Sequence, residues 1–314
     1  MNVASIDIGS NTVLLLIAKI NFSQSSFQSL LNEYRIPRIS NGITKSGKIS
    51  DTKIIELIEV LREYQKICKE FGVSKYIIKA TNAMRIAENS SYIVERINEE
   101  LGLKIEIISG EQEANLSYVG AKSSFSDIEE SFVLDIGGGS TEFIHGNKSG
   151  MLFRKSFPKG AVNLTEENIE NYPPNSDEIK NLDDSIENTF NTIKNFKDRN
   201  IPLIAVAGTP TTLACIKQNL KEYAENRIEK FILRKSDLEE SIEEFRMKLP
   251  QELLNNYGKI IEGREDVILA GTKILLKVLN NLNMDSLYVS GRGLRYGSIE
   301  QLIEELQEKR VEFP

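Results

Sequence analysis

Residues 132–144 read FVLDIGGGSTEFI and decide how the chain is organised. The apolar run at residues 132–134 is typical of a buried strand, and a second apolar pair follows at residues 143–144. Between them stand an aspartate, three consecutive glycines and two hydroxyl residues. Glycine adopts positive φ freely and lets another group approach the backbone closely. The stretch therefore predicts two strands joined by a turn whose bare backbone can receive a ligand.

The same pattern occurs near the start of the chain. Residues 3–16 read VASIDIGSNTVLLL, again a buried strand, an Asp-Ile-Gly turn and a second apolar strand. Asp7 and Asp135 are 128 residues apart. Chance can repeat so short a motif, but the matching strands on both sides favour a duplicated unit. We therefore predict two similar domains, each opening with a hairpin around a glycine turn.

Strands and helices alternate over the rest of the chain. Apolar spacing predicts one helix over residues 51–71 and another within residues 263–282. A loop at residues 291–297 should precede a closing helix. The further strands are expected at residues 76–80, 105–109, 203–207 and 287–290. This alternation indicates the α/β class.

The composition of the 314-residue chain limits the kinds of protein it can be. Hydrophobic residues make up 40% and charged residues 27%, as in globular proteins, and the net charge of −7 argues against a basic nucleic-acid binder. The N-terminal apolar run is interrupted by polar residues, so we expect neither a signal peptide nor a membrane partner. Cys68 and Cys215 lie in apolar helical patterns and are expected to be buried, reduced thiols of a cytoplasmic protein.

Four turns follow predicted strands and carry hydroxyl or amide donors. Loops at the carboxyl ends of strands line the ligand crevice of an open α/β sheet, and successive backbone N–H groups can converge on an anion. Each turn alone could be a simple tight connection, but together they favour a phosphate cradle. Neither the Walker nor the dinucleotide consensus is present. The four turns are residues 9–12, 137–141, 208–212 and 291–297.

Acids beside these turns are candidates for the chemistry of a phosphate site. Asp7, Asp135 and Glu142 offer the hard oxygen ligands that Mg²⁺ takes, although the two aspartates are equally explained as turn formers. Glu111 and Glu113 have a plain explanation too, because acids favour the first turn of a helix.

Four arginines are candidates for binding phosphate. An arginine side chain can bind phosphate through two N–H groups, unless it is solvated or paired with an acid. The candidates are Arg85, Arg264, Arg292 and Arg295. The single histidine, His145, excludes a histidine-based metal cluster, and we expect it at a hairpin tip.

Seven motifs run along nearly the whole chain in a fixed order. They are IDIGSNTVLLL, KATNAMRIAEN, IISGEQEANLSYVGA, LDIGGGSTEFI, AVAGTPTTLA, GREDVILAG and VSGRGLRYG. In this order they resemble the Ppx/GppA phosphatases, which are exopolyphosphatases and guanosine pentaphosphate phosphohydrolases. The resemblance implies two actin-like (ribonuclease H-like) domains around a central cleft. The first domain would comprise residues 1–122 and the second residues 123–297. It also implies that a C-terminal helix, at about 298–314, packs back on the first domain, and that the protein is a homodimer.

The resemblance also assigns roles to residues. Glu113, in SGEQEA, matches the family's catalytic glutamate, which would orient or deprotonate the attacking water. The metal positions match Asp135 and Glu142, with Asp7 facing them from the other domain, and the cofactor would be Mg²⁺. The residues expected to bind phosphate are Ser10, Asn11, Arg85, Gly138, Gly139, Ser140, Thr141 and Thr209.

Two features depart from the family pattern. Long members add a C-terminal domain resembling the HD hydrolases, which we expect to be absent, so the chain resembles the short, two-domain members. The last motif commonly ends Gly-Leu-Arg-Glu-Gly, whereas this chain has Tyr296 in place of the glutamate.

The implied reaction is Mg²⁺-assisted hydrolysis of a terminal phosphoanhydride, with inorganic polyphosphate as the favoured substrate. Guanosine pentaphosphate is the alternative, because it also ends in a phosphoanhydride. An actin-like ATPase or sugar kinase would share the turns but would need an adenosine pocket. A non-hydrolysing alarmone-binding protein would have no need for a water-orienting acid such as Glu113.

Overall fold

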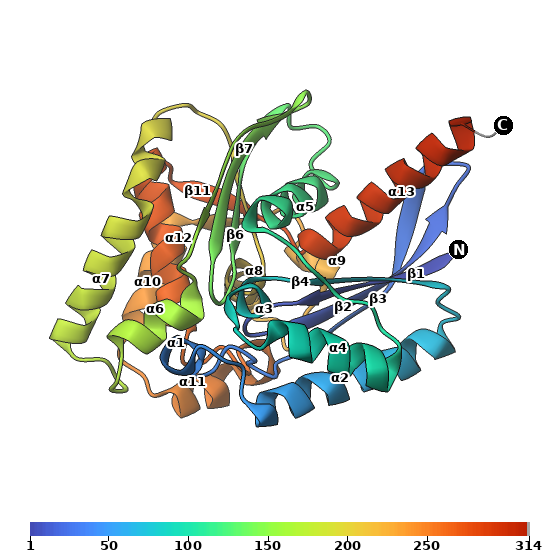
Figure 1. Ribbon diagram of the computed structural model, residues 1–314. Helices are drawn as coiled ribbons and strands as arrows, with labels where there is room; N and C mark the ends of the chain where they lie inside the picture. The colour runs from blue at the N-terminus through green and yellow to red at the C-terminus, as the bar shows by residue number, and fades with distance from the viewer. Residues whose placement is uncertain (313–314) are drawn as a thin grey trace. The chain divides into compact units, whose positions relative to one another are not determined.

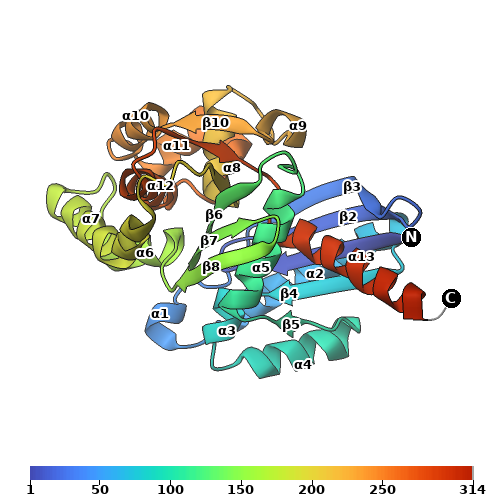
Figure 2. The same cartoon turned by 90° about the horizontal axis from the view of Figure 1, so that it is seen from above.

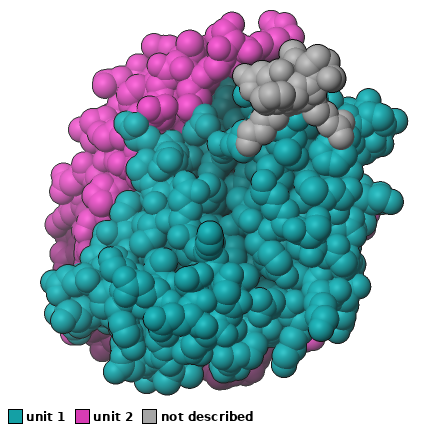
Figure 3. All heavy atoms as spheres, turned by 45° about the vertical axis from the view of Figure 1, so that its right-hand side comes forward, with its two compact units in different colours: residues 1–123, 292–314 teal, residues 124–291 magenta. Residues whose placement is uncertain are grey.

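The computed structural model describes residues 1–312 and is drawn in Figure 1. The chain divides into two compact units: unit 1 is Met1–Ser123 with Arg292–Pro314, and unit 2 is Ser124–Gly291. Figure 3 shows unit 1 in teal and unit 2 in magenta. The predicted closing helix at about 298–314 includes residues 313–314, which lie outside the described residues.

The sheet of unit 1 begins with three antiparallel strands, β1 (Asn2–Ile8), β2 (Val13–Asn21) and β3 (Ser26–Arg35). On the other side of β1 lie two parallel strands, β4 (Lys75–Ala80) and β5 (Glu106–Ile107), which gives the order β3-β2-β1-β4-β5. The predicted pairing of the first two strands is confirmed. The sequence did not predict β3, because none of its residues is fully buried and it has no apolar run typical of a core strand.

The side chains of β1 alternate between the two faces of this sheet, and helices cover both faces. Ala4, Ile6 and Ile8 pack with the apolar face of α2, whereas Val3 packs with α13. The predicted helix over residues 51–71 is confirmed as α2, whose cap Ser50 accepts from the amide of Lys53. The helices of this unit are α1 (Ile43–Ser46), α2 (Asp51–Glu70), α3 (Asn82–Ile86), α4 (Ser90–Leu101), α5 (Gly110–Lys122) and α13 (Leu294–Glu312).

Helices α5 and α13 cross unusually closely, and glycines make this possible. A Cβ atom on Gly120 would lie 2.1 Å from the carbonyl oxygen of Gly293, and one on Gly297 would lie 1.9 Å from that of Leu116. The loop predicted at 291–297 is therefore wrong over its second half, because α13 already begins at Leu294. The glycine that suggested a loop serves helix packing instead.

The residue that departs from the family motif, Tyr296, is buried in this region. It is 1% exposed and belongs to a cluster with Val3 and Leu16, and its ring centroid lies 5.9 Å from that of Phe27. Arg292 lies over the tyrosine ring at 5.1 Å. An apolar site of this kind favours an aromatic ring over an ionised glutamate.

Arg295 ties α13 to the sheet instead of serving as a phosphate ligand. It is 7% exposed, and its Nη1 donates to the carbonyl of Leu15 at 3.0 Å and to Oδ1 of Asn32 at 2.6 Å.

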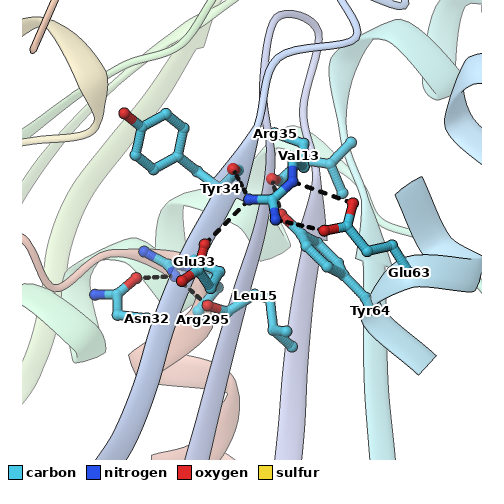
Figure 4. Close-up of polar contacts among 9 residues, drawn as sticks. All are labelled: Val13, Leu15, Asn32, Glu33, Tyr34, Arg35, Glu63, Tyr64 and Arg295. Carbon is cyan, nitrogen blue, oxygen red and sulfur yellow. Dashed lines mark hydrogen bonds and ion pairs between the residues drawn. The ribbon is translucent and has the colours of Figure 1, made fainter. Parts of the chain in front are cut away.

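Figure 4 shows the Arg295 contacts beside a second polar group, in which Tyr64 Oη donates to the carbonyl of Val13 at 2.8 Å. Arg35 bridges Glu33 and Glu63 next to them, and the ion pairs raise the pKa of its guanidinium.

The sheet of unit 2 repeats the strand order of unit 1. Its order is β10-β11-β9-β6-β7-β8, so that β8-β7-β6-β9-β11 corresponds to β3-β2-β1-β4-β5. Figure 2 shows β6, β7 and β8 side by side. The β6–β7 hairpin is antiparallel. β9 runs parallel to β6 and β11 runs parallel to β9, just as β4 runs parallel to β1 and β5 to β4. The strands are β6 (Glu130–Ile136), β7 (Thr141–Asn147), β8 (Gly150–Phe157), β9 (Leu203–Val206), β10 (Phe231–Arg234) and β11 (Ser286–Val289). The predicted duplication and the α/β class are confirmed.

The core of unit 2 forms where its helices cover the sheet. Phe132 and Leu134 of β6 belong to one cluster with Ile274 and Val278 of α12. The α-helices are α6 (Ala161–Asn168), α7 (Ser176–Phe190), α8 (Gly208–Lys217), α9 (Glu225–Ile228), α10 (Lys235–Phe245), α11 (Pro250–Tyr257) and α12 (Ile268–Leu282), with 3₁₀ helices at Asn191–Phe196 and Gly258–Ile260. No helix among the described residues has the length and apolar character needed to span a membrane.

Two expectations about single residues have different outcomes. Cys68 and Cys215 are free and buried, as predicted. The placement of His145 at a hairpin tip is wrong, because β7 continues to Asn147 and His145 is a strand residue only 3% exposed. Its Nε2 lies 2.6 Å from Glu130 Oε1, and its ring packs near Phe132, so this histidine is part of the core.

Candidate functional site

Two carboxylates of unit 2 face each other across the β6–β7 hairpin. Asp135 lies directly opposite Glu142 in the strand register. Glu142 is fully buried, and Ser156 Oγ on β8 donates to its Oε1 at 2.6 Å. The hairpin therefore holds an acid pair whose buried member is fixed by a hydroxyl from the next strand.

The turn between these strands is closed by its own backbone and by the start of α6. The amide of Gly137 donates to the carbonyl of Ser140 at 3.0 Å. The carbonyl of Gly137 accepts from the amide of Ala161 at 3.0 Å, and that of Gly138 accepts from Val162 at 2.8 Å. The hydroxyl of Thr141 donates to the carbonyl of Lys159 at 2.8 Å, so this predicted phosphate ligand also holds the turn in place.

Residues at the start of α6 complete this support, and no local sequence pattern predicts their role. Asn163 Nδ2 donates to the carbonyl of Gly139 at 2.9 Å, and its Oδ1 accepts from the amide of Gly160 at 2.7 Å. A Cβ atom on Gly160 would lie 2.4 Å from the carbonyl oxygen of Gly137. Only glycine therefore allows α6 to approach the turn this closely, and the PKGAVN stretch around it was the available signal.

This arrangement directs backbone amides of the turn away from α6. A trans peptide points its C=O and N–H in opposite directions. Because the carbonyls of Gly137, Gly138 and Gly139 all point to α6, the amides of Gly138, Gly139 and Ser140 point to the other side. Neither Gly138 nor Gly139 donates a hydrogen bond to another residue within 1–312. Adjacent amides of this kind form a concavity that suits an anion.

A second anion-facing feature of unit 2 is the N-terminus of α8. The predicted loop at 208–212 is in fact the first turn of this helix, and it follows Ala207, whose φ of 76° is strained for a residue with a side chain. Arg264 lies against Gly208, with its Nε 2.5 Å from where a Cβ would be. The side chain of Thr209 lies against Gly271 of α12, so this residue would meet a ligand through its amide.

In unit 1 the corresponding turn joins β1 to β2. The amide of Gly9 donates to the carbonyl of Thr12 at 3.0 Å, which leaves Ser10 and Asn11 at the tip. Asp7 stands opposite Leu14 in the register, where unit 2 has the Asp135–Glu142 pair. Unit 1 thus has the turn and its aspartate without a second acid across the hairpin.

Glu113 is distinguished from a simple first-turn acid by its surroundings. Ser109 and Gln112 form a capping box at the start of α5, which sets the direction of the helix's first turn. Glu113 is 8% exposed, and its Oε2 accepts from Arg85 Nη1 at 3.0 Å. Glu111 by contrast is exposed, so the helix-end explanation suffices for it.

Arg85 is held between α5 and the strand that precedes it. Its Nη1 also donates to the carbonyl of Ile108 at 2.9 Å, and 25% of its side chain is exposed. Its Nε and Nη2 make no hydrogen bond to another described residue, so part of the guanidinium remains available. The structure thus brings together two predicted site residues of unit 1, Arg85 and Glu113.

The predicted metal ligands are only partly assembled within one unit. Asp135 and Glu142 lie in unit 2 and Asp7 in unit 1. Among the described residues, no group of three or more His, Cys, Asp or Glu side chains is arranged to hold a metal. The donor chemistry nevertheless fits Mg²⁺, which is usually bound through one or two carboxylates and completes its shell with water and phosphate oxygens.

A cavity of about 320 Å³ in unit 1 lies apart from these residues. Its lining includes Lys75 and Lys79 of β4 and Ser298 and Gln301 of α13. None of the predicted site residues lines it. The candidate site is therefore a set of strand-end turns and not this cavity.

The fold and these turns define a class of protein: two α/β units of one topology, each with an aspartate at the end of its first strand and a donor-rich turn behind it. The sequence matches the model of the Ppx/GppA phosphatase family over residues 16–306. The chain belongs to this family.

Curated relatives carry names from both branches of the family. A bifunctional 3-dehydroquinate synthase/phosphatase of Fusobacterium nucleatum is 29% identical over 96% of this chain and 46% of its own length. A guanosine-5'-triphosphate,3'-diphosphate pyrophosphatase of Vibrio parahaemolyticus is 25% identical over 98% of this chain and 60% of its own length. Exopolyphosphatase 2 of Mycobacterium tuberculosis is 28% identical over 70% of this chain and 72% of its own length. The chain thus spans about half of the first relative and 60% of the second.

Solved structures show the same fold over nearly the whole length. The Ppx-GppA enzyme of Aquifex aeolicus is 34% identical, with a TM-score of 0.80 over 96% of this chain and 99% of that one. An exopolyphosphatase of Cytophaga hutchinsonii is 26% identical, with a TM-score of 0.88 over 97% of this chain and 98% of that one.

Proposed function

We propose that this protein is an exopolyphosphatase that releases terminal phosphate from inorganic polyphosphate. The observation that carries this proposal is the buried Glu113 carboxylate, paired with Arg85 at 3.0 Å. Burying a carboxylate is costly unless it is paired, and such a placement is typical of a functional acid. Relatives named exopolyphosphatase from Mycobacterium tuberculosis and Cytophaga hutchinsonii support the choice of substrate.

The anion-facing groups of the structure would bind the phosphates. In unit 2 these are the amides of Gly138, Gly139 and Ser140, with the N-terminus of α8 and Arg264 beside it. In unit 1 they are the turn with Ser10 and Asn11 and the remaining donors of Arg85. Backbone amides suit this role because they are preorganised and cost no reorganisation during the reaction.

Glu113 would act on the attacking water. The new bond joins the water oxygen to the terminal phosphorus, and the bond from that phosphorus to the bridging oxygen breaks. The shortened polyphosphate would leave with the bridging oxygen and its electron pair, and the water's proton would pass to the Glu113 carboxylate. The transition state of such transfers is loose, so positioning contributes more than proton abstraction. The hydrogen bond from Arg85 fixes the carboxylate and therefore gives the water a defined direction.

Asp135 and Glu142 would hold Mg²⁺, and Asp7, at the corresponding strand position of unit 1, is a further candidate metal ligand. The bound ion would neutralise charge on the phosphate oxygens. Ser156 holds Glu142 in place through its hydrogen bond to Oε1. In the same proposal the protein is a cytoplasmic homodimer.

A second candidate substrate is guanosine pentaphosphate, which ends in the same bond. The Vibrio parahaemolyticus relative, named a pyrophosphatase for guanosine-5'-triphosphate,3'-diphosphate, matches 98% of this chain and supports this alternative. A non-hydrolysing alarmone-binding protein is a further alternative, which the retained Glu113, Asp135 and Glu142 disfavour.

One assay separates these proposals. Phosphate release is followed from long-chain polyphosphate, guanosine pentaphosphate and ATP, each with Mg²⁺, for the wild type and for Glu113→Gln. We expect release chiefly from polyphosphate and its loss in the variant. Release chiefly from the pentaphosphate would assign the chain to the alarmone branch, and tight binding without release would favour the sensor.

A further inference from the structure

A loop that no sequence motif singled out lies against the β1–β2 turn of unit 1. This loop, residues 36–42, follows β3 and reads IPRISNG. The amide of Arg38 donates to the carbonyl of Asn11 at 3.0 Å, and the amide of Ser40 donates to the carbonyl of Ser10 at 3.1 Å. The loop and the turn therefore form one hydrogen-bonded pair of segments.

The backbone of the loop is held in an unusual conformation at this contact. Arg38 has φ of 51°, in the left-handed region that residues with a side chain rarely adopt. Strain of this kind persists where the surrounding structure imposes it and is commonest at ligand sites. The carbonyl of Arg38 accepts from Asn41 at 3.1 Å, and that of Ser40 accepts from Ile43 at 2.9 Å, so the second half of the loop is also held by its own backbone.

Two serine hydroxyls occur where the two segments meet. Ser10 is 4% exposed and Ser40 is 6% exposed. The Oγ atoms of both are buried and make no hydrogen bond within the described part of the chain. Buried hydroxyls are nearly always hydrogen-bonded, so these two hydroxyls are suited to donate to a bound ligand.

We propose that Ser40 is a further substrate-binding residue, which together with Ser10 donates a hydroxyl to an oxygen of a bound phosphoryl group. The inference rests on the proposed function, because it assigns the ligand of the same turn. A phosphate oxygen accepts from any donor, and a hydroxyl turns freely to reach it. Neither the loop nor residues 9–12 contain an acid that would repel an anion.

The test is a binding titration that does not depend on turnover. Tripolyphosphate is titrated calorimetrically, with Mg²⁺, into Ser40→Ala, Ser10→Ala and the parent protein, all in the Glu113→Gln background. We expect each serine variant to raise the Kd about tenfold, since a hydrogen bond to a charged group is lost. The control is Ser131→Ala in unit 2, because Ser131 is also fully buried with an Oγ that has no partner among the described residues.

Thermal unfolding without ligand separates a binding role from a structural one. Removing an unpaired buried hydroxyl should leave the melting temperature unchanged or raise it, in Ser40→Ala and in Ser131→Ala alike. Weaker tripolyphosphate binding with unimpaired stability in Ser40→Ala, and unchanged binding in Ser131→Ala, supports the inference. A Kd within twofold of the parent for Ser40→Ala overturns it, and so does weakening that appears only with a lowered melting temperature.

Failure of the proposed function gives a different result. A wild type that binds tripolyphosphate but releases no phosphate from any substrate contradicts the hydrolase while the titration still decides the role of Ser40. Should Ser40→Ala not fold, Ser40→Cys replaces it, because its thiol is a far weaker donor of similar shape.

Discussion

The two units contain the same hairpin, but each supports its glycine turn in a different way and places a different residue opposite its aspartate. In unit 2 the start of α6 accepts the turn through Gly160 and Asn163, and Asp135 faces Glu142. In unit 1 the loop 36–42 holds the turn, and Asp7 faces Leu14. The acid pair thus belongs to unit 2, while the paired Arg85 and Glu113 belong to unit 1. Under the proposed function, unit 2 would mainly hold the metal and unit 1 would mainly direct the water.

The strongest test of this division is Glu113→Gln. The amide keeps the shape of the side chain but cannot hold the water as a carboxylate does, so we expect kcat for polyphosphate to fall by about 10³-fold with KM changed less than threefold. Steady-state phosphate release measures both constants. The matched control is Glu111→Gln, because Glu111 is an exposed acid of the same helix turn. Equal losses in the two variants would deny Glu113 any special role.

The acid pair of unit 2 should respond differently. Glu142→Gln is expected to lower kcat/KM by about 100-fold and to raise the Mg²⁺ concentration needed for half-maximal activity, because a charged oxygen ligand is lost. Titration of activity with Mg²⁺ measures the shift. Ser156→Ala removes only the hydroxyl that donates to Glu142, so a few-fold effect in the same direction is expected. An unchanged Mg²⁺ dependence in Glu142→Gln would end the assignment of the metal to unit 2.

The support of the unit 2 turn is tested by Gly160→Ala. The added Cβ would meet the backbone of Gly137 and Gly138 at 2.4 and 2.7 Å, so we expect about 2 kcal/mol of destabilisation, in the range of overpacked sites. Urea unfolding measures it. Gly72→Ala is the control, since its Cβ would meet nothing within 4 Å and only its φ of +61° is strained. A smaller loss of stability in Gly160→Ala than in Gly72→Ala would show that α6 can move away from the turn at little energetic cost.

The sequence predicts those parts of this comparison that depend on local pattern. The first hairpin strands and the repeated Asp-Ile-Gly turn stand out because their core residues form continuous apolar runs. Strand β3 does not, because its residues are only partly buried on both faces. The role of Gly160 and the proposed role of Ser40 depend on segments that meet only after folding, and no local pattern reveals such contacts.

Glycine was also the main source of error. The GRGLRYG stretch suggests a loop, yet Gly297 is where α13 crosses α5, and Arg295 binds the backbone of Leu15. A glycine needed for positive φ and a glycine needed for close helix packing look alike in a single sequence. His145 was misplaced for a similar reason, because the polar residues after it suggested a turn two residues too early.

The smallest expected effect concerns the cysteines, of which each unit contains one. Burial raises the pKa of both Cys68 and Cys215 to about 11, so at pH 8 almost no thiolate is present and both thiols are covered. We therefore expect a thiol reagent to label neither in the native protein and both in urea. Stoichiometric labelling of the folded protein would contradict the buried placement.

The same reagent can report on each unit separately. In Cys68→Ser only the thiol of Cys215 remains, on α8, whose N-terminus is one of the proposed anion sites. In Cys215→Ser only the thiol of Cys68 remains, on α2. Slow labelling under mild urea follows local opening, and a bound ligand slows the opening of whatever it stabilises. Because Cys215 lies on the helix whose N-terminus is proposed to bind phosphate, tripolyphosphate should slow the labelling of Cys215. Unchanged labelling of Cys215 in the presence of tripolyphosphate would contradict the assignment of the α8 N-terminus as an anion site.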